Sequence, residues 1–222
     1  MKAMILAAGR GKRMGNLTQT CPKPLLKVKG RCLLDWHLSK LCEAGFKDVV
    51  INVSYLSKEI IEFVGNGSIW GLNIAISEEA EVLETAGGIK KAIKYLGHDP
   101  FVVINADIFS NYDYKNLIIK SLDNRSMGYL VLVNNPEHNL EGDFGLLDDA
   151  TLTMNSDRLL TFSGIAIYDP KFFSELTVGS KVKLSPILEI AINKKCIKGE
   201  LFEGFWSDVG TPERLNMINL DE

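Results

Sequence analysis

Glycines and basic side chains crowd residues 9–15, whose sequence is GRGKRMG. Gly9 and Gly11 let the backbone approach an anion and present successive N–H groups to it. Lys12 and Arg13 can add charge-assisted hydrogen bonds to phosphate oxygens. The segment therefore predicts a loop that binds polyphosphate, in preference to a structural turn that binds nothing.

Lys23 lies between Pro22 and Pro24, a few residues after this loop. Each proline fixes its own φ angle and restricts the residue before it, so we expect an extended, stiff segment. An ammonium group held beside a phosphate loop can neutralise the charge on a phosphorus atom that gains a fifth ligand. The alternative is an ordinary surface lysine in a turn.

Two aspartates are candidate metal ligands. Asp107 follows the apolar run 101–104, so it is expected at the carboxyl end of a strand, where open α/β sheets bind their ligands. Magnesium prefers one or two carboxylates together with substrate phosphates, and Asp208 is the best candidate for the second carboxylate. Each aspartate could instead cap a helix or a turn, and their spacing does not show that they meet.

Better-known catalytic patterns do not fit this chain. Gly15 comes one position late for a GxGxxG dinucleotide fingerprint, and no Gly-Lys-Ser/Thr triplet of a Walker A loop follows. The cysteines, at positions 21, 32, 42 and 196, lack the spacing of a zinc site. His37, His98 and His138 are interpreted as ordinary packing or solvent-facing residues, because they form no convincing catalytic set with a nucleophile.

Hydrophobic periodicity predicts the elements that position these residues. We predict strands at 3–8, 49–53, 72–76, 101–104, 127–133, 159–168 and 197–202, and helices at 33–44, around 60–64, at 86–96, at 184–191 and from 212 onward. Thr211 is expected to cap the last helix. Strands that alternate with helices form parallel βαβ units. We therefore expect one domain over residues 1–222, an α/β Rossmann-like three-layer sandwich with a mixed, mostly parallel sheet.

Composition restricts the partners of the chain. The formal net charge of −3 gives no field that would attract nucleic acid or an anionic membrane across the whole surface. The sequence shows no secretory leader pattern and no stretch of about 18 apolar residues. We expect a cytoplasmic protein, a monomer or homodimer, with neither nucleic acid nor a membrane as partner.

Five motifs, in order along the chain, resemble those of the sugar-1-phosphate nucleotidyltransferases. They occupy residues 6–14, 22–24, 83–88, 105–107 and 206–211. The resemblance implies a nucleotidyltransferase (GT-A-like) fold and a Mg²⁺-dependent reaction between a nucleoside triphosphate and a sugar 1-phosphate. The chain departs from the pattern at residues 15–16, where relatives often carry a proline, and at Ala106, where relatives have glycine. The added methyl group would crowd a substrate that approaches the backbone at that position.

The resemblance also implies roles for individual residues. The base and ribose of the nucleotide are expected near Ala7, Ala8, Gly9, Glu79, Ala80 and Gly87. The triphosphate is expected on Gly11, Lys12 and Arg13, with Arg13 and Lys23 as the catalytic cations. Asp107 and Asp208 are expected to hold Mg²⁺. The sugar-phosphate pocket is expected to contain Asn105, Asp143, Gly164 and Lys183.

Within this family, weaker signals are most similar to the uridylyltransferases of cell-wall recycling that act on N-acetylmuramic acid 1-phosphate. These signals lie at residues 84–88, 135–136, 142–144, 161–165 and 183–184. They imply UTP and N-acetylmuramic acid 1-phosphate as substrates, with UDP-N-acetylmuramic acid and pyrophosphate as products. Mannose 1-phosphate, glucose 1-phosphate and phosphocholine are alternative acceptors. A non-catalytic module that binds a nucleotide sugar is the alternative from another functional class.

Overall fold

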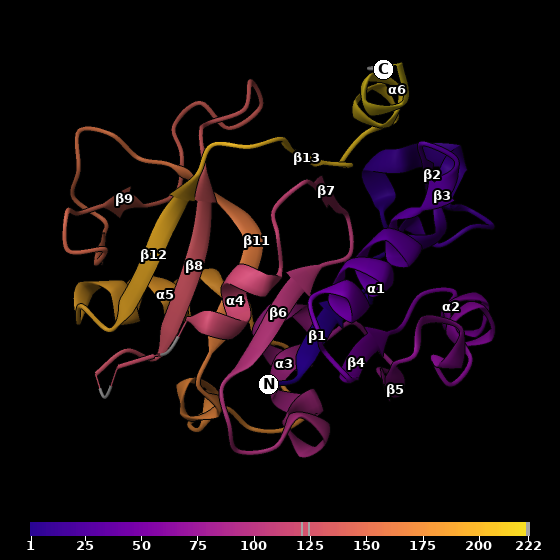
Figure 1. The fold of residues 1–222 in the computed structure, drawn as a ribbon, viewed down its shortest axis with the longest axis horizontal. Coiled ribbons are helices and arrows are strands. Elements are labelled where there is room, and N and C mark those ends of the chain that lie inside the picture. The colour runs from indigo at the N-terminus through magenta and orange to yellow at the C-terminus, as the bar shows by residue number, and fades with distance from the viewer. Residues whose placement is uncertain (121, 124, 221–222) are drawn as a thin grey trace.

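The computed structural model describes residues 1–120, 122–123 and 125–220, and its centre is a seven-stranded sheet (Figure 1). The strand order across the sheet is β12-β8-β11-β6-β1-β4-β5. The strands are β1 (Ala3–Leu6), β4 (Asp48–Val53), β5 (Asn73–Glu78), β6 (Phe101–Asn105), β8 (Gly128–Val133), β11 (Thr161–Tyr168) and β12 (Ile197–Phe202). Of these seven, β11 alone runs against its neighbours, so the expectation of a mixed, mostly parallel sheet is confirmed.

Alternating side chains of β1 separate two apolar cores. Ala3 and Ile5 lie in one core with Leu38, whereas Met4 lies in the other with Ile89. A parallel strand that is buried on both faces needs helices on both sides of the sheet. The first core is covered by α1 (Leu33–Glu43), α2 (Ser57–Val64) and α4 (Lys115–Ile119), and the second by α3 (Glu84–Leu96) and α5 (Ser185–Asn193). Figure 1 shows α1 and α4 in front of the sheet and α3 behind it, which confirms the three-layer arrangement.

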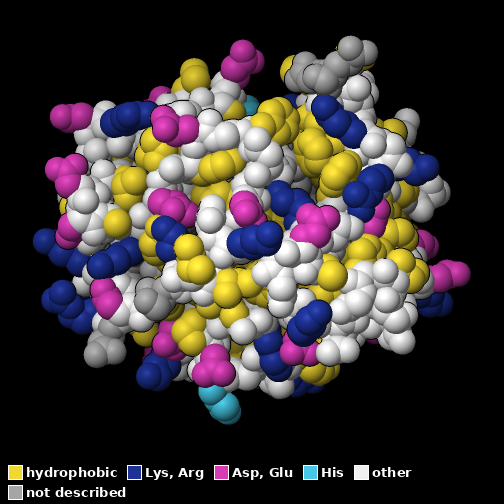
Figure 2. Space-filling view, in the orientation of Figure 1, with side chains coloured by type: hydrophobic (Ala, Val, Ile, Leu, Met, Phe, Trp, Pro, Cys, Tyr) yellow, Lys and Arg dark blue, Asp and Glu magenta, His cyan; other side chains and the backbone are white. Residues whose placement is uncertain are grey.

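Short strand pairs and 3-10 helices lie outside the main sheet and its helices. They are the pairs β2 (Lys27–Val28) with β3 (Arg31–Cys32), β7 (Ile108–Ser110) with β13 (Trp206–Asp208) and β9 (Gly145–Leu146) with β10 (Leu152–Thr153), and the 3-10 helices η1 (Lys12–Thr18), η2 (Lys23–Leu25), η3 (Ser68–Trp70) and η4 (Pro170–Phe173). None of the helices in the described ranges combines the length and apolar character that crossing a membrane requires. Basic and acidic side chains are interspersed over the face drawn in Figure 2.

Two segments near the amino terminus differ from the expected conformation. Lys23 begins the 3-10 turn η2, so the segment around it is only partly extended. The following proline tolerates this turn because the first residues of a helix need no N–H partner. The loop after β1 contains the 3-10 helix η1, which kinks at Gly15 with φ 57° and ψ −127°. A residue with a side chain rarely adopts these angles, which explains why glycine stands there.

The carboxyl-terminal helix α6 (Pro212–Leu220) packs on this amino-terminal region. A third, small apolar cluster joins them; its buried members are Met14, Leu26, Val28, Leu33, Val209, Leu215 and Ile218. Thr211 accepts a hydrogen bond from the N–H of Arg214 at 3.4 Å, as expected for the residue that caps the helix. Helix α6 therefore supports η1 and the loop before it.

We predict that Ile218→Ala lowers the free energy of unfolding by about 2–4 kcal/mol, because it leaves a cavity in this cluster. Ile218 is 3% exposed, whereas its neighbour Met217 is 56% exposed. Met217→Ala is the matched control and should change the free energy by no more than about 0.5 kcal/mol. Urea titration followed by tryptophan fluorescence measures both values. Equal effects of the two substitutions would contradict the packing of α6 described above.

Candidate active site

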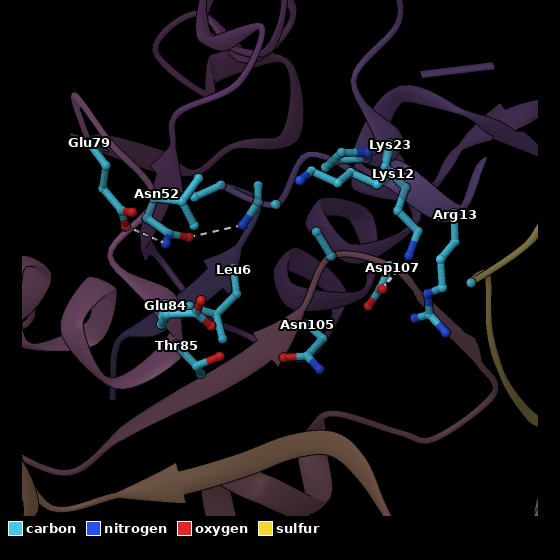
Figure 3. A pocket seen from close by; sticks show the side chains of 18 residues that line it. Leu6, Lys12, Arg13, Lys23, Asn52, Glu79, Glu84, Thr85, Asn105 and Asp107 are labelled. Atoms are coloured by element: carbon cyan, nitrogen blue, oxygen red, sulfur yellow. Dashed lines mark hydrogen bonds and ion pairs between the residues drawn. The ribbon is translucent and has the colours of Figure 1, made fainter. Parts of the chain in front are cut away.

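A cavity of about 380 Å³ opens where β1, β4 and β6 end, and we call it the glycine-loop cavity (Figure 3). Its lining consists of Leu6, Ala7, Ala8, Gly9, Gly11, Lys12, Arg13, Lys23, Pro24, Asn52, Glu79, Val82, Glu84, Thr85, Asn105, Ala106, Asp107 and Gly210. Carboxyl ends of parallel strands are the usual place for a ligand in a sheet of this type. Most residues that the sequence assigns to a nucleotide therefore meet in one cavity.

The glycine loop is shaped by a close approach to Lys23. Gly11 has φ 62°, and a Cβ atom added to it would lie 3.2 Å from the Cβ of Lys23. The hydroxyl of Thr18 donates to the carbonyl of Gly11 at 3.0 Å and closes the loop. Glycine is required here both for the backbone angle and for the space. Lys12 and Arg13, which follow it, are exposed at the rim of the cavity.

A buried polar pair holds the opposite wall, as Figure 3 shows. The side-chain carbonyl of Asn52 accepts the N–H of Ala7 at 2.9 Å, and its amide donates to Glu79 at 2.8 Å. The second oxygen of Glu79 accepts the N–H of Leu83 at 2.9 Å. A Cβ atom on Gly88 would lie 2.7 Å from Glu79, so glycine leaves room for this carboxylate. The Asn52–Glu79 pair thus fixes the start of the glycine loop relative to α3.

Lys23 and Asp107 form an ion pair across the floor of the glycine-loop cavity. Their side chains are 11% and 32% exposed, so the lysine is largely enclosed and the carboxylate partly open to solvent. The carbonyl of Asp107 also accepts the N–H of Val209 at 2.7 Å. Each side chain compensates the charge of the other, which burial of a lone lysine would not permit.

Asp208 lies on the strand next to Asp107 but has different partners. Strand β13 pairs with β7 so that Asp208 stands opposite Ile108. Its Oδ1 atom forms an ion pair with Arg214 and lies 2.9 Å from Nε2 of His138. A Cβ atom on Gly210 would lie 1.9 Å from Arg214, so glycine at 210 lets the guanidinium reach the aspartate. The structure thus brings the two backbones together and gives each carboxylate its own cation.

These carboxylates fit a magnesium site that a substrate helps to build. Within the described residues, no group of three or more His, Cys, Asp and Glu side chains could hold a metal ion. Magnesium needs only one or two protein carboxylates when phosphates and water supply the other ligands. Asp107, in the turn before β7, and Asp208, on the neighbouring strand β13, provide that number.

A second cavity of about 380 Å³ adjoins the first, and we call it the α5 cavity. Its lining consists of Leu6, Thr85, Val103, Asn105, Gly142, Asp143, Phe144, Met154, Phe162, Gly164, Tyr168, Leu184, Ser185, Leu188 and Glu189. Leu6, Thr85 and Asn105 line both cavities, so the two form one continuous cleft. The cleft can therefore hold two ligands with a common wall between them.

Local backbone features shape the wall of the α5 cavity. Gly164 has φ 81° and lies where the pairing of β11 with β8 shifts register. A Cβ atom there would lie 2.6 Å from the amide nitrogen of Asn105, so glycine makes room for that side chain. The carboxylate of Asp143 accepts the N–H of Phe162 at 2.7 Å, which fixes its position. Asn105, Asp143 and Gly164, which the family resemblance places together, thus line one cavity.

Four residues expected in the site lie outside both linings: Ala80, Gly87, Lys183 and Asp208. Gly87 serves packing instead, because a Cβ atom on it would lie 2.2 Å from the carbonyl of Ser180. Ala80 and Lys183 are exposed. Asp208 itself does not line the glycine-loop cavity, but Gly210, two residues later in the chain, does. The sequence therefore predicts the segments of the site better than it predicts the direction of single side chains.

Several lining residues were not identified from the sequence. They are Asn52, Val82, Glu84, Thr85, Ser185, Glu189 and Gly210. Asn52 carried a usable signal, since it interrupts an otherwise apolar strand. Glu84 has φ 60°, a conformation that only the folded chain reveals. His37, by contrast, is a buried packing residue, as expected. Burial lowers its pKa to about 4, and its Nδ1 atom lies 2.8 Å from the hydroxyl of Tyr114.

Two proteins of known activity are similar to this chain in sequence over nearly its whole length. N-acetylmuramate alpha-1-phosphate uridylyltransferase of Neisseria meningitidis serogroup B is 46% identical over 220 residues, which cover 97% of this chain and 95% of that protein. Mannose-1-phosphate guanyltransferase of Aspergillus fumigatus is 32% identical over 235 residues, and the match covers 96% of this chain but 62% of that protein.

The fold is shared with a solved structure from Bacillus anthracis, of a protein provisionally assigned as a glucose-1-phosphate thymidylyltransferase. The TM-score is 0.85 at 21% sequence identity, and the match covers 99% of this chain and 94% of that one. At this identity the likeness concerns the fold alone. The family described as nucleotidyl transferase matches residues 2–222. The chain, with its glycine loop, its Lys23–Asp107 pair and its two-part cleft, belongs to the nucleotidyl transferase family.

Proposed function

We propose that this enzyme transfers UMP from UTP to N-acetylmuramic acid 1-phosphate. The products are UDP-N-acetylmuramic acid and pyrophosphate, in peptidoglycan recycling. The observation that carries the proposal is the cleft itself, in which the glycine-loop cavity, with Lys12, Arg13 and Lys23 in its lining, and the α5 cavity share Leu6, Thr85 and Asn105. The uridylyltransferase relative at 46% identity supports the choice of substrates.

The reaction is an in-line displacement. A phosphate oxygen of the sugar 1-phosphate, bound in the α5 cavity, forms a bond to the α-phosphorus of the nucleotide in the glycine-loop cavity. The bond from that phosphorus to the bridging oxygen breaks, and pyrophosphate leaves with the electron pair. A phosphate oxygen is already ionised at neutral pH, so no protein group has to remove a proton. Catalysis therefore depends on position and on electrostatic stabilisation.

Arg13 and Lys23 supply the positive charge in this proposal. Both line the glycine-loop cavity, and Lys23 is held by a short turn rather than by a long flexible loop. A preorganised cation stabilises the transition state without rearranging during the reaction. Asp107 and Asp208 would hold Mg²⁺, which when bound neutralises phosphate oxygens. Lys12 adds a further contact to the triphosphate.

The acceptor half of the cleft favours a substrate rich in hydroxyl groups. The charged residues that line the α5 cavity within the described chain are Asp143 and Glu189, and both are acidic. Carboxylates accept hydrogen bonds from sugar hydroxyls but repel another carboxylate. We therefore place the lactyl carboxylate of the acceptor at the mouth of the cavity. The exposed Lys183, next to the lining residue Leu184, is its proposed partner.

The decisive test is pyrophosphate release in the presence of Mg²⁺. UTP, CTP, GTP, dTTP and ATP are each combined with N-acetylmuramic acid, N-acetylglucosamine, glucose and mannose 1-phosphates and with phosphocholine. We expect the highest kcat/KM for UTP with N-acetylmuramic acid 1-phosphate. Faster turnover of another pair would keep the mechanism and replace the substrates. Absence of turnover with every pair, in protein that binds a nucleotide, would instead support the non-catalytic module.

We predict that Lys23→Ala lowers kcat by roughly two orders of magnitude, since one preorganised electrostatic contact contributes about 3 kcal/mol to transition-state stabilisation. Lys58→Ala, which changes an exposed lysine of α2, is the matched control. Steady-state kinetics and a thermal melt on both variants separate catalysis from folding. Near wild-type turnover in Lys23→Ala would remove this residue from the proposed mechanism.

We predict that Asp107→Asn abolishes the Mg²⁺-dependent turnover, because an amide oxygen binds this ion far more weakly than a carboxylate does. Turnover is measured against Mg²⁺ concentration in this variant and in Asp99→Asn. Asp99 is exposed and remote from both cavity linings, so its variant should follow the wild-type curve. An unaltered Mg²⁺ response in Asp107→Asn would show that Asp107 does not hold the metal.

A further inference from the structure

The loop that carries Asp143 into the α5 cavity is fastened at its base. We call residues 134–142 the His138 loop. Its Asn135 donates to the carbonyl of Leu159 at 3.0 Å, and the amide of Asn139 donates to the hydroxyl of Thr161 at 3.0 Å. Both contacts join the loop to the segment that enters β11. They hold the loop near its start and at Asn139, the residue next to His138.

His138 makes the contact at the outer part of the loop. Its Nε2 atom lies 2.6 Å from Nη1 of Arg214 and 2.9 Å from Oδ1 of Asp208. One ring nitrogen cannot accept from the arginine and donate to the aspartate together, so one of these contacts is a hydrogen bond and the other is proximity. Among the described residues, every side-chain hydrogen bond or ion pair between this loop and the β13–α6 corner goes through His138.

The partners of His138 lie on either side of Gly210, a residue in the wall of the other cavity. Gly210, between Asp208 and Arg214, lines the glycine-loop cavity. The side chains of Arg214 and Asp208 are 14% and 19% exposed, and α6 is anchored below them by Leu215 and Ile218. The corner is therefore a firm support. His138 links this support to the loop that ends at Gly142 and Asp143 in the α5 cavity.

We infer that His138 is a positioning residue, which holds the outer wall of the α5 cavity against the β13–α6 corner and so sets where the acceptor lies relative to the nucleotide. The inference rests on the proposed function in one respect, that the α5 cavity takes the acceptor. An in-line displacement is sensitive to this placement, because a shift of about 1 Å in a reacting group can cost up to roughly 100-fold in rate. The histidine thus contributes to the reaction without contacting the reacting atoms.

The first test is kinetic and uses the nucleotide and acceptor that the wild-type enzyme turns over best. We expect His138→Ala to lower kcat about tenfold, to raise the KM for the acceptor and to leave the KM for the nucleotide within about twofold. His138→Gln, which keeps a donor and an acceptor, should recover most of the loss. His98→Ala changes an exposed histidine far from the cleft and should match the wild type. Equal rises in both KM values, or no change in either, would overturn the inference.

The second test needs no substrate, so it stands even if the proposed reaction fails. Glu137 and Glu141 are exposed and flank the outer part of the His138 loop. We expect a glutamate-specific protease to cleave at these residues faster in His138→Ala than in the wild type, His138→Gln or His98→Ala, with mass spectrometry locating the cut. Cleavage at the wild-type rate in His138→Ala would show that the histidine does not hold the loop.

Discussion

The parallel pairing of β1 with β4 and β6 is the constraint on which the cleft depends. This register places Leu6 beside Asn52 on one side and beside Asn105 on the other. Asn52 then reaches the backbone of Ala7, while Leu6 and Asn105 enter the wall shared by both cavities. A slip of one residue would turn these side chains to the opposite face of the sheet. Such a slip is strongly disfavoured, because the buried Asn52 would lose its hydrogen bonds with Ala7 and Glu79.

The Lys23–Asp107 ion pair connects the strands that shape the cleft with the proposed reaction. A lysine enclosed to this extent needs a nearby anion, and Asp107 provides it at the end of β6. In the proposed reaction both groups change partner, the lysine to a phosphate and the aspartate to a cation. Charge is balanced before and after that exchange, so neither group has to be left buried and uncompensated. This balance explains why a cation and a carboxylate are kept so close in a site that we propose binds an anion.

The sequence predicted the sheet and the principal helices because each rests on a local pattern, whereas the residues of the α5 cavity were implied by the family resemblance. Apolar runs predicted β1, β4 and β6, and clustered glycines and basic residues predicted the loop of Gly11 and Arg13. Side-chain direction depends instead on contacts between distant segments. Gly87 packs against residue 180 instead of lining a cavity, and Lys183 is exposed, although both lie in recognisable motifs. His138, interpreted as an ordinary residue, finds Asp208 and Arg214 only after three separate segments have folded together.

The two halves of the cleft are held by different kinds of contact. The glycine-loop cavity is built mainly on backbone geometry, such as the φ angle of Gly11 and the register of β1, with the buried Asn52–Glu79 pair in support. The outer wall of the α5 cavity is paired to Leu160 through the backbone of Asp143 and Phe144. The loop before it is held by side-chain contacts, and among these His138 reaches the β13–α6 corner. A loop can change its sequence without disturbing the sheet, because few core residues depend on it. In the proposed reaction the position of the nucleotide therefore depends on the sheet, and the position of the acceptor depends in part on the contacts of the His138 loop.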